Sequence, residues 1–128
     1  MRIFCDMDMV LVHQTSSEGF DRMPWFKDGK LLWEAIKGRA PILLTQVRES
    51  RFGLSSHEKL VWIKRELGVG TPVIFTPDSV GKGPHARPGD VLIDDSVKHC
   101  ADWRNGGGSP ILHRSLTDTL SQLNAILK

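Results

Sequence analysis

The chain has 128 residues, the length of one ordinary domain and too short for two cores of useful size. Hydrophobic residues make up 40% of the sequence and charged residues 25%, close to the averages of soluble globular proteins, which excludes a disordered, collagenous or disulfide-built chain. The formal net charge of +2 is too small to indicate a nucleic-acid or membrane surface by itself.

Cysteine spacing and the N-terminal residues indicate the cellular compartment of the protein. Cys5 and Cys100 show neither disulfide nor metal-type spacing, and His99 beside Cys100 does not have the spacing of a structural zinc site. Asp6 and Asp8 interrupt the first apolar run, so it does not form the apolar region of a secretory signal. Apolar stretches fall far short of the roughly 20 residues that a membrane-spanning helix needs. We therefore expect reduced thiols in a soluble, cytoplasmic protein with no membrane partner.

Short apolar runs alternate with helical segments along the chain. Continuous apolar runs of this length are typical of strands buried on both faces, and their alternation with helices predicts an α/β fold with a parallel sheet covered on both sides. The predicted elements, in chain order, are strand Arg2–Cys5, helix Asp28–Lys37, strand Pro41–Leu44, helix Ser55–Leu67, strand Pro72–Phe75, strand Val91–Ile93, helix Val97–Arg104, strand Pro110–His113 and helix Ser115–Leu127.

Capping residues and glycines mark where these elements end. Asp28 is placed to cap the first helix, and Ser55 with Glu58 has the spacing of a capping box at the start of the second. Glycines at 106–108 predict a turn that stops the third helix. Two long loops remain, residues 13–27 and residues 76–90, and long irregular segments in a small domain are often functional.

Polar side chains follow the predicted strands. Because ligands bind beyond the carboxyl ends of parallel strands, we expect these side chains to meet in one crevice. They are Asp6 and Asp8 after the first strand, Thr45 after the second, Lys82 beyond the third, and Asp94 and Asp95 after the fourth.

Carboxylates brought together repel one another unless a cation or a raised pKa compensates them. Oxygen ligands favour Mg²⁺, which completes its shell with water and phosphate oxygens. A phosphate substrate is therefore the natural inference, with Thr45 and Lys82 binding its remaining oxygens.

Four motifs resemble those of the haloacid dehalogenase (HAD) superfamily of phosphohydrolases. They are Ile3-Phe4-Cys5-Asp6-Met7-Asp8-Met9-Val10, Ile42-Leu43-Leu44-Thr45, Lys82, and Leu92-Ile93-Asp94-Asp95, in the family's order. Each follows a predicted strand, which makes the set far more specific than any single motif. The region from Trp103 to His113 also resembles small 5'-nucleotidase-type members. This resemblance implies a Rossmann-like three-layer sandwich with a five-stranded parallel sheet, as one domain over residues 1–128.

The resemblance also implies a role for each site residue. Asp6 is the nucleophile that forms an aspartyl-phosphate, and Asp8 is the acid and base. Thr45 and Lys82 bind the phosphate. Mg²⁺ is held by Asp6, Asp8 through its main-chain carbonyl, Asp94, and Asp95 directly or through water. The activity implied is that of a Mg²⁺-dependent phosphoric monoester hydrolase.

Two positions depart from the family's pattern. The residue after the second aspartate, often glycine in the family, is Met9, whose side chain narrows the mouth of the site or constrains the turn. Lys59 and Lys64 on the preceding helix are alternatives to Lys82 for the third motif. We favour Lys82, in a loop, because we expect the other two on a solvated helix face.

The cap that gives specificity to many family members has little room here. Residues 13–27 suffice for a flap or minimal cap, which implies an open site suited to a large substrate, or to a small one if a second copy in a homodimer covers the cleft. Arg48, Arg51 and Arg87 are candidate substrate contacts, and an aromatic in the Trp25-Phe26 pair is a candidate for stacking on a base. These features favour a phosphorylated small molecule, nucleotide or nucleic-acid end.

Three other functions use similar residues. A phosphotransferase passes the aspartyl-phosphate to an acceptor other than water, and a regulatory module binds phosphate without turnover. A receiver domain combines carboxylates, Thr, Lys and Mg²⁺, but its acidic pair comes first and its Lys last. Here Asp94 and Asp95 follow Lys82, which argues against a receiver.

Overall fold

The sheet consists of five parallel strands in the order β3-β2-β1-β4-β5. The structure, a computed structural model, describes residues 1–16 and 19–128. The strands are β1 (Ile3–Cys5), β2 (Ile42–Val47), β3 (Val73–Pro77), β4 (Val91–Asp94) and β5 (Ser109–Leu112). The helices are α1 (Gly29–Ile36), α2 (Phe52–Glu66), α3 (Val97–Asn105) and α4 (Leu116–Leu127), with short 3-10 turns η1 (Phe20–Arg22), η2 (Lys37–Arg39), η3 (Glu49–Arg51) and η4 (Gly83–His85).

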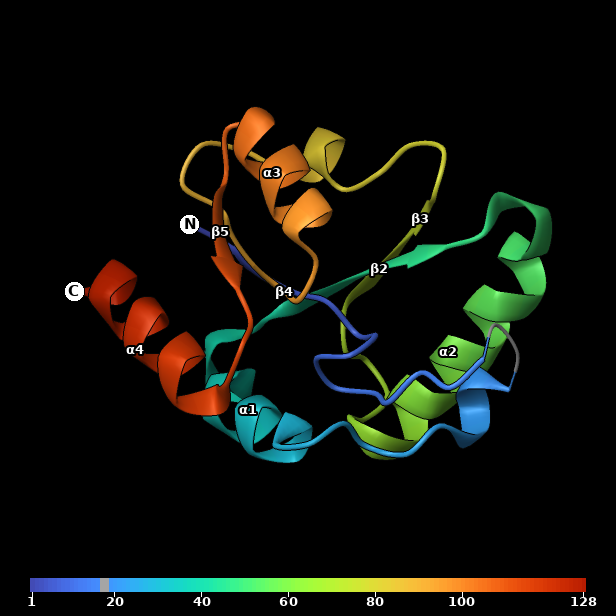
Figure 1. Ribbon diagram of the computed structural model, residues 1–128. Coiled ribbons are helices and arrows are strands. Elements are labelled where there is room, and N and C mark those ends of the chain that lie inside the picture. The colour runs from blue at the N-terminus through green and yellow to red at the C-terminus, as the bar shows by residue number, and fades with distance from the viewer. Residues whose placement is uncertain (17–18) are drawn as a thin grey trace.

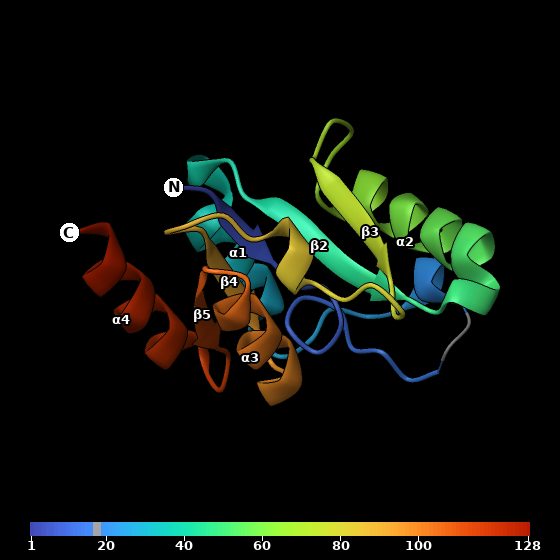
Figure 2. The same cartoon turned by 90° about the horizontal axis from the view of Figure 1, so that it is seen from above.

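Helices cover both faces of the sheet, so the molecule has three layers. In Figure 1, α1, α2 and α4 lie on one side of the strands, and α3 lies with η4 on the other. Seen from the α3 side, α3 lies in front of β4 and β5 and does not extend over β2 and β3 (Figure 2). The α/β, Rossmann-like architecture expected from the sequence is therefore confirmed.

Alternate residues of the buried strands supply two separate cores, because successive side chains of a strand point to opposite faces. The larger core joins Ile3, Cys5, Leu43 and other strand residues to the helices α1, α2 and α4. The smaller core contains Phe4, Leu44, Leu92 and Trp103 under α3. Continuous burial on both faces explains why these strands read as unbroken apolar runs.

The third helix begins at Val97 as predicted, but the start of α2 and two of the caps differ from those expected. The helix α2 begins at Phe52, so Ser55 lies inside it instead of capping it, and Glu58 accepts a hydrogen bond from the Gly19 main-chain N–H, 3.0 Å away. Asp28 is the residue before α1, but its backbone is left-handed and its side chain makes no capping bond. Ser96 and Ser115, in contrast, do cap α3 and α4 through their hydroxyls. None of the described helices has the length and apolarity needed to span a membrane.

Candidate active site

The site lies at the carboxyl ends of β1, β2 and β4, where the strand order reverses about β1. Cys5 is in register with Leu43 on one side and with Ile93 on the other. Residues 6 and 94 are therefore level across the sheet, and Thr45 lies one residue beyond on β2. Asp6 is fixed further by its main-chain N–H, which donates to the Ile93 carbonyl at 2.9 Å.

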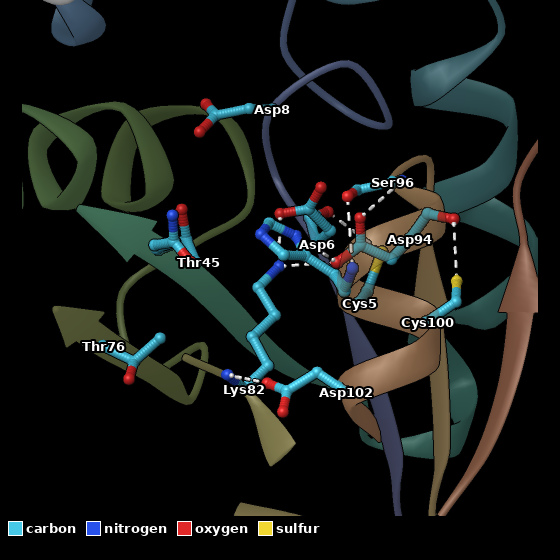
Figure 3. A network of polar contacts seen from close by, with 12 residues as sticks. Cys5, Asp6, Asp8, Thr45, Thr76, Lys82, Asp94, Ser96, Cys100 and Asp102 are labelled. Atoms are coloured by element: carbon cyan, nitrogen blue, oxygen red, sulfur yellow. Dashed lines mark hydrogen bonds and ion pairs between the residues drawn. The ribbon is translucent and has the colours of Figure 1, made fainter. Parts of the chain in front are cut away.

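Lys82 lies between two of these carboxylates. Its Nζ donates to Asp6 Oδ1 at 2.8 Å and to Asp94 Oδ2 at 2.7 Å, and its side chain is fully buried (Figure 3). A buried ammonium needs such partners, because burial without them carries a large desolvation penalty. The lysine predicted from the third motif thus reaches the predicted nucleophile.

The protonation of this group follows from burial and charge together. Burial raises the pKa of Asp6 well above its usual value, with Asp94 and Asp8 adding to the rise against the charge of Lys82. Burial alone would also raise the pKa of Asp94, but His99 and Lys82 hold that pKa well below its usual value. The pKa of Lys82 is raised by Asp6 and Asp94 despite burial. One lysine therefore does not balance the negative charge, and a further cation would favour the ionised form of Asp6.

A second lysine holds the other predicted residues. Lys59, on α2, donates from Nζ to Asp8 Oδ2 at 2.9 Å, to Thr45 Oγ1 at 2.7 Å and to the Gln46 carbonyl at 3.0 Å. Its side chain is 1% exposed, so the expectation that it lies on a solvated helix face was wrong. Its register, with Ser55, Trp62 and Ile63 on the buried face of α2, is the signal that the sequence offered.

The carboxylates include a group suited to a cation. One oxygen each from Asp6, Asp94 and Asp95 lie within 4.8 Å of one another. The donors are all carboxylate oxygens, the ligand type that Mg²⁺ prefers, so the residues fit that ion. Burial raises the pKa of Asp95, with Asp94 contributing, as expected for uncompensated charge. The Asp8 side chain is not in this group and lies apart from Asp6 (Figure 3).

A cleft of about 500 Å³ opens above these groups. Its lining residues include the three aspartates Asp6, Asp8 and Asp95 together with Phe20, Gln46 and His99. Met9 also lines it, with a φ of 62°, in the left-handed region that favours glycine. No motif in the sequence pointed to Phe20 or Gln46 as cleft residues, or to His99, whose Nδ1 lies 3.2 Å from Asp94 Oδ2.

The three arginines predicted to contact substrate lie in different places. Arg48 is exposed and lines the cleft. Arg51, at the end of η3, is half-buried and is not among the lining residues. Arg87 lies in the turn before β4, where its N–H donates to Asp90 Oδ2 at 3.1 Å, so it is at the opposite end of β4 from Asp94. The structure therefore does not bring Arg87 to the cleft.

The aromatic pair of the flap does not line the cleft either. Trp25 packs edge-to-face on Trp62 at 4.9 Å between ring centroids, and its Nε1 donates to Glu66 at 3.0 Å. Phe26 contacts His13 in a similar way. Phe20 is the aromatic residue of this segment that lines the cleft.

No protein-family model matches the sequence, and no curated protein matches it. The structure is similar to the crystal structure of a D,D-heptose 1.7-bisphosphate phosphatase from B. bronchiseptica complexed with magnesium and phosphate. The TM-score is 0.60 at 14% sequence identity, over 95% of this chain and 87% of that chain. The likeness shows that this chain shares the α/β fold of that protein.

Proposed function

We propose that the protein is a Mg²⁺-dependent phosphatase that hydrolyses phosphate monoesters through an aspartyl-phosphate on Asp6. The observation that carries the proposal is the placement of Asp6: it is buried at the end of β1, bonded to Lys82, and grouped with Asp94 and Asp95. A phosphatase of the same fold, crystallised with magnesium and phosphate, supports the same reaction class.

In the first half-reaction, an Asp6 oxygen attacks phosphorus in line, and the bond from phosphorus to the leaving oxygen breaks. Asp8 gives the leaving oxygen a proton. Asp8 Oδ2 is held by Lys59, whereas Oδ1 is buried with no hydrogen-bond partner in the described part of the chain, so Oδ1 is the atom that exchanges the proton.

In the second half-reaction, Asp8 takes a proton from water as the water oxygen attacks phosphorus. The bond from phosphorus to Asp6 breaks, which releases inorganic phosphate and regenerates both carboxyl groups. Thr45, Lys59 and Lys82 bind phosphoryl oxygens and offset the repulsion between two anions. Asp6, Asp94, Asp95 and the main-chain carbonyl of Asp8 would hold Mg²⁺, which supplies positive charge where the phosphoryl group carries negative charge.

For the substrate, we propose a nucleotide or a nucleic-acid end. The cleft supports this choice with Arg48 for a second anionic group and Phe20 for the apolar face of a base. Gln46, another lining residue, adds an amide that can hydrogen-bond a base edge or a sugar hydroxyl.

The test is phosphate release from a panel of 5'- and 3'-nucleotides, end-phosphorylated oligonucleotides, sugar phosphates and a phosphopeptide. We expect release with Mg²⁺ that stops in EDTA and in Asp6→Asn, while Asp118→Asn, on the exposed face of α4, retains it. Transfer to an added nucleoside instead of water would indicate a phosphotransferase. Tight binding without release from the intact protein would contradict the proposal and indicate a regulatory module.

A further inference from the structure

The loop that carries Lys82 is held by one carboxylate of α3. Asp102 Oδ2 accepts a hydrogen bond from the main-chain N–H of Lys82 at 3.0 Å (Figure 3). It accepts a second from the main-chain N–H of Gly83 at 2.8 Å. From the other side, Thr76 Oγ1, on β3, donates to the Gly81 carbonyl at 2.8 Å. These contacts fix the backbone from which the Lys82 side chain extends to Asp6 and Asp94.

Glycines allow the helix and the loop to approach this closely. A Cβ atom at Gly81 would lie 2.8 Å from Asp102 Oδ2, and one at Gly83 would lie 2.6 Å from the Asp102 carbonyl oxygen. A Cβ at Gly106, just beyond α3, would lie 2.3 Å from the Gly83 carbonyl oxygen. Side chains at these positions would push the loop away from α3, which gives a physical reason for the glycines on both sides of Lys82.

The same helix also orients Asp94. Asp94 Oδ1 accepts the main-chain N–H of Ser96 at 3.0 Å, directly before α3, and Asp94 Oδ2 lies 3.2 Å from His99 Nδ1. His99 and Asp102 are three residues apart and therefore share one side of α3. One turn of α3 thus contacts both Asp94 and the backbone of the lysine that bonds it.

From this geometry we infer that Asp102 is a positioning residue for the proposed phosphatase. Its carboxylate holds the main chain at Lys82 and Gly83, and this places the Lys82 ammonium between Asp6 and Asp94. His99, on the same side of α3, contacts Asp94. The inference rests on the proposed function for its catalytic consequence. The contact itself does not depend on activity and can be tested separately.

Three variants separate this role from a general effect on the helix. We expect Asp102→Ala to lower kcat by about 100-fold, which is the effect of a misplacement of about 1 Å. KM should change much less, because Lys82 bonds the carboxylates and its displacement affects the reacting groups. Asp102→Asn keeps a side-chain oxygen that can accept both N–H groups, so it should restore most of kcat. Arg104→Ala, at an exposed position of α3, is the matched control.

A double-mutant cycle tests whether Asp102 acts through Lys82. With Lys82 already replaced by alanine, Asp102→Ala should lower kcat no further, since the group it positions is gone. If Asp102→Ala lowers kcat by the same factor in both backgrounds, the residue has only a structural role and the inference fails. Equal activity of Asp102→Ala and the wild type would also overturn it.

Hydrogen exchange of residues 79–86 tests the contact without using activity. We expect faster exchange of this segment in Asp102→Ala, with wild-type protection in Arg104→Ala and near wild-type protection in Asp102→Asn. Unchanged exchange in Asp102→Ala would overturn the inference. If the wild type releases no phosphate from any substrate but the exchange pattern is as expected, the proposed function fails and the contact of Asp102 with the loop stands.

Discussion

Lys59 and Lys82 each hold one of the two aspartates that follow β1. Lys82 bonds Asp6 from the loop after β3, and Lys59 bonds Asp8 from α2. Both ammonium groups are buried, and removing one partner of a buried ion pair leaves the other charge uncompensated. The conformations of the two aspartates therefore depend on elements distant in sequence.

Replacing Lys59 with methionine should destabilise the protein and slow the proposed reaction. The side chain keeps its length, but Asp8 Oδ2 and Thr45 Oγ1 lose their donor. We expect a decrease in the free energy of unfolding of about 1–3 kcal/mol, measured by urea denaturation, because buried acceptors are left without a hydrogen bond. Lys64→Met, at an exposed position of the same helix, is the control.

Adding Asp8→Asn to Lys59→Met should restore part of the stability, since it removes the uncompensated charge. The double variant should stay inactive, because the proposed acid and base is absent. A Lys59→Met protein with wild-type stability and turnover would show that the bonds of Lys59 to Asp8 and Thr45 contribute nothing measurable.

Asp90 predicts a pH dependence of stability. Burial alone would raise the pKa of Asp90. Hydrogen bonds from the main chain and side chain of Arg2 and from the Arg87 N–H outweigh burial and lower that pKa below its usual value. A lowered pKa in the folded state means stabilisation that is present above the unfolded pKa of about 3.9 and is lost as the pH falls through the lower, folded value.

We therefore expect Asp90→Asn to lower the free energy of unfolding by about 1–3 kcal/mol at neutral pH. The difference from wild type should shrink below about pH 4, as the wild-type carboxylate takes up a proton. Urea denaturation at several pH values measures it, with Asp118→Asn as the exposed control. A difference that stays constant with pH would contradict the assignment to the Asp90 charge.

At the scale of elements, the segment from Gly19 to Trp25 is fixed to α2 and carries one wall of the cleft, formed by Phe20. Trp62 Nε1 donates to the Met23 carbonyl at 2.9 Å, and the Trp62 ring packs against Trp25. Gly19 is bonded to Glu58, and the Phe20 ring lies 4.7 Å from the Lys59 ammonium. These contacts place Phe20 at the cleft, so the position of this wall depends on one face of α2.

Trp62→Phe should therefore loosen that wall. The substitution removes the bond to the Met23 carbonyl and part of the ring packing, and we expect a loss of about 1–3 kcal/mol in stability. KM of the proposed reaction should rise more than kcat falls, because in the proposed function Phe20 contacts the substrate and not the reacting carboxylates. Hydrogen exchange of residues 19–26 should speed up in this variant and not in Trp33→Phe, a buried change on α1.

The sequence predicted the strands to within one to three residues because burial on both faces leaves unbroken apolar runs. The start of α2 was harder to predict. The turn η3 leads directly into α2, so the serine at 55 has the spacing of a cap but lies a turn inside the helix. Local spacing does not distinguish a capping box from a polar position within a helix.

The grouping of Asp6, Asp94 and Thr45 at one end of the sheet was predictable because each directly follows an apolar run, although β2 and β4 extend to include Thr45 and Asp94. Lys59 was named as an alternative to Lys82 and wrongly expected on a solvated face, because a lysine is rarely buried. Arg87 was misplaced because loop composition does not say which end of a strand a residue lies at. The contact of Asp102 with Lys82 joins residues 20 apart in sequence and has no local signal.

At the scale of the whole molecule, the topology gathers negative charge at one edge of the sheet. The loops after β1 and β4 bring Asp6, Asp94 and Asp95 together, although the chain as a whole has a formal charge of +2. Burial and the neighbouring carboxylates raise the pKa of Asp6. In the folded state these carboxylates repel one another, whereas in the unfolded chain they are far apart. Binding a divalent cation to the folded state should therefore stabilise the whole fold.

Mg²⁺ should raise the free energy of unfolding by about 2.7 kcal/mol at one hundred times its dissociation constant, since only the folded state assembles the three carboxylates. Thermal unfolding measures this as a Tm that increases with Mg²⁺ concentration and returns to its starting value with EDTA. Asp94→Asn and Asp95→Asn should each weaken the dependence, because each removes a ligand charge from the group. Sodium chloride at matched ionic strength separates binding from screening of the carboxylates. A Tm that responds equally to both salts, or equally in wild type and Asp94→Asn, would mean that the three carboxylates do not bind a cation.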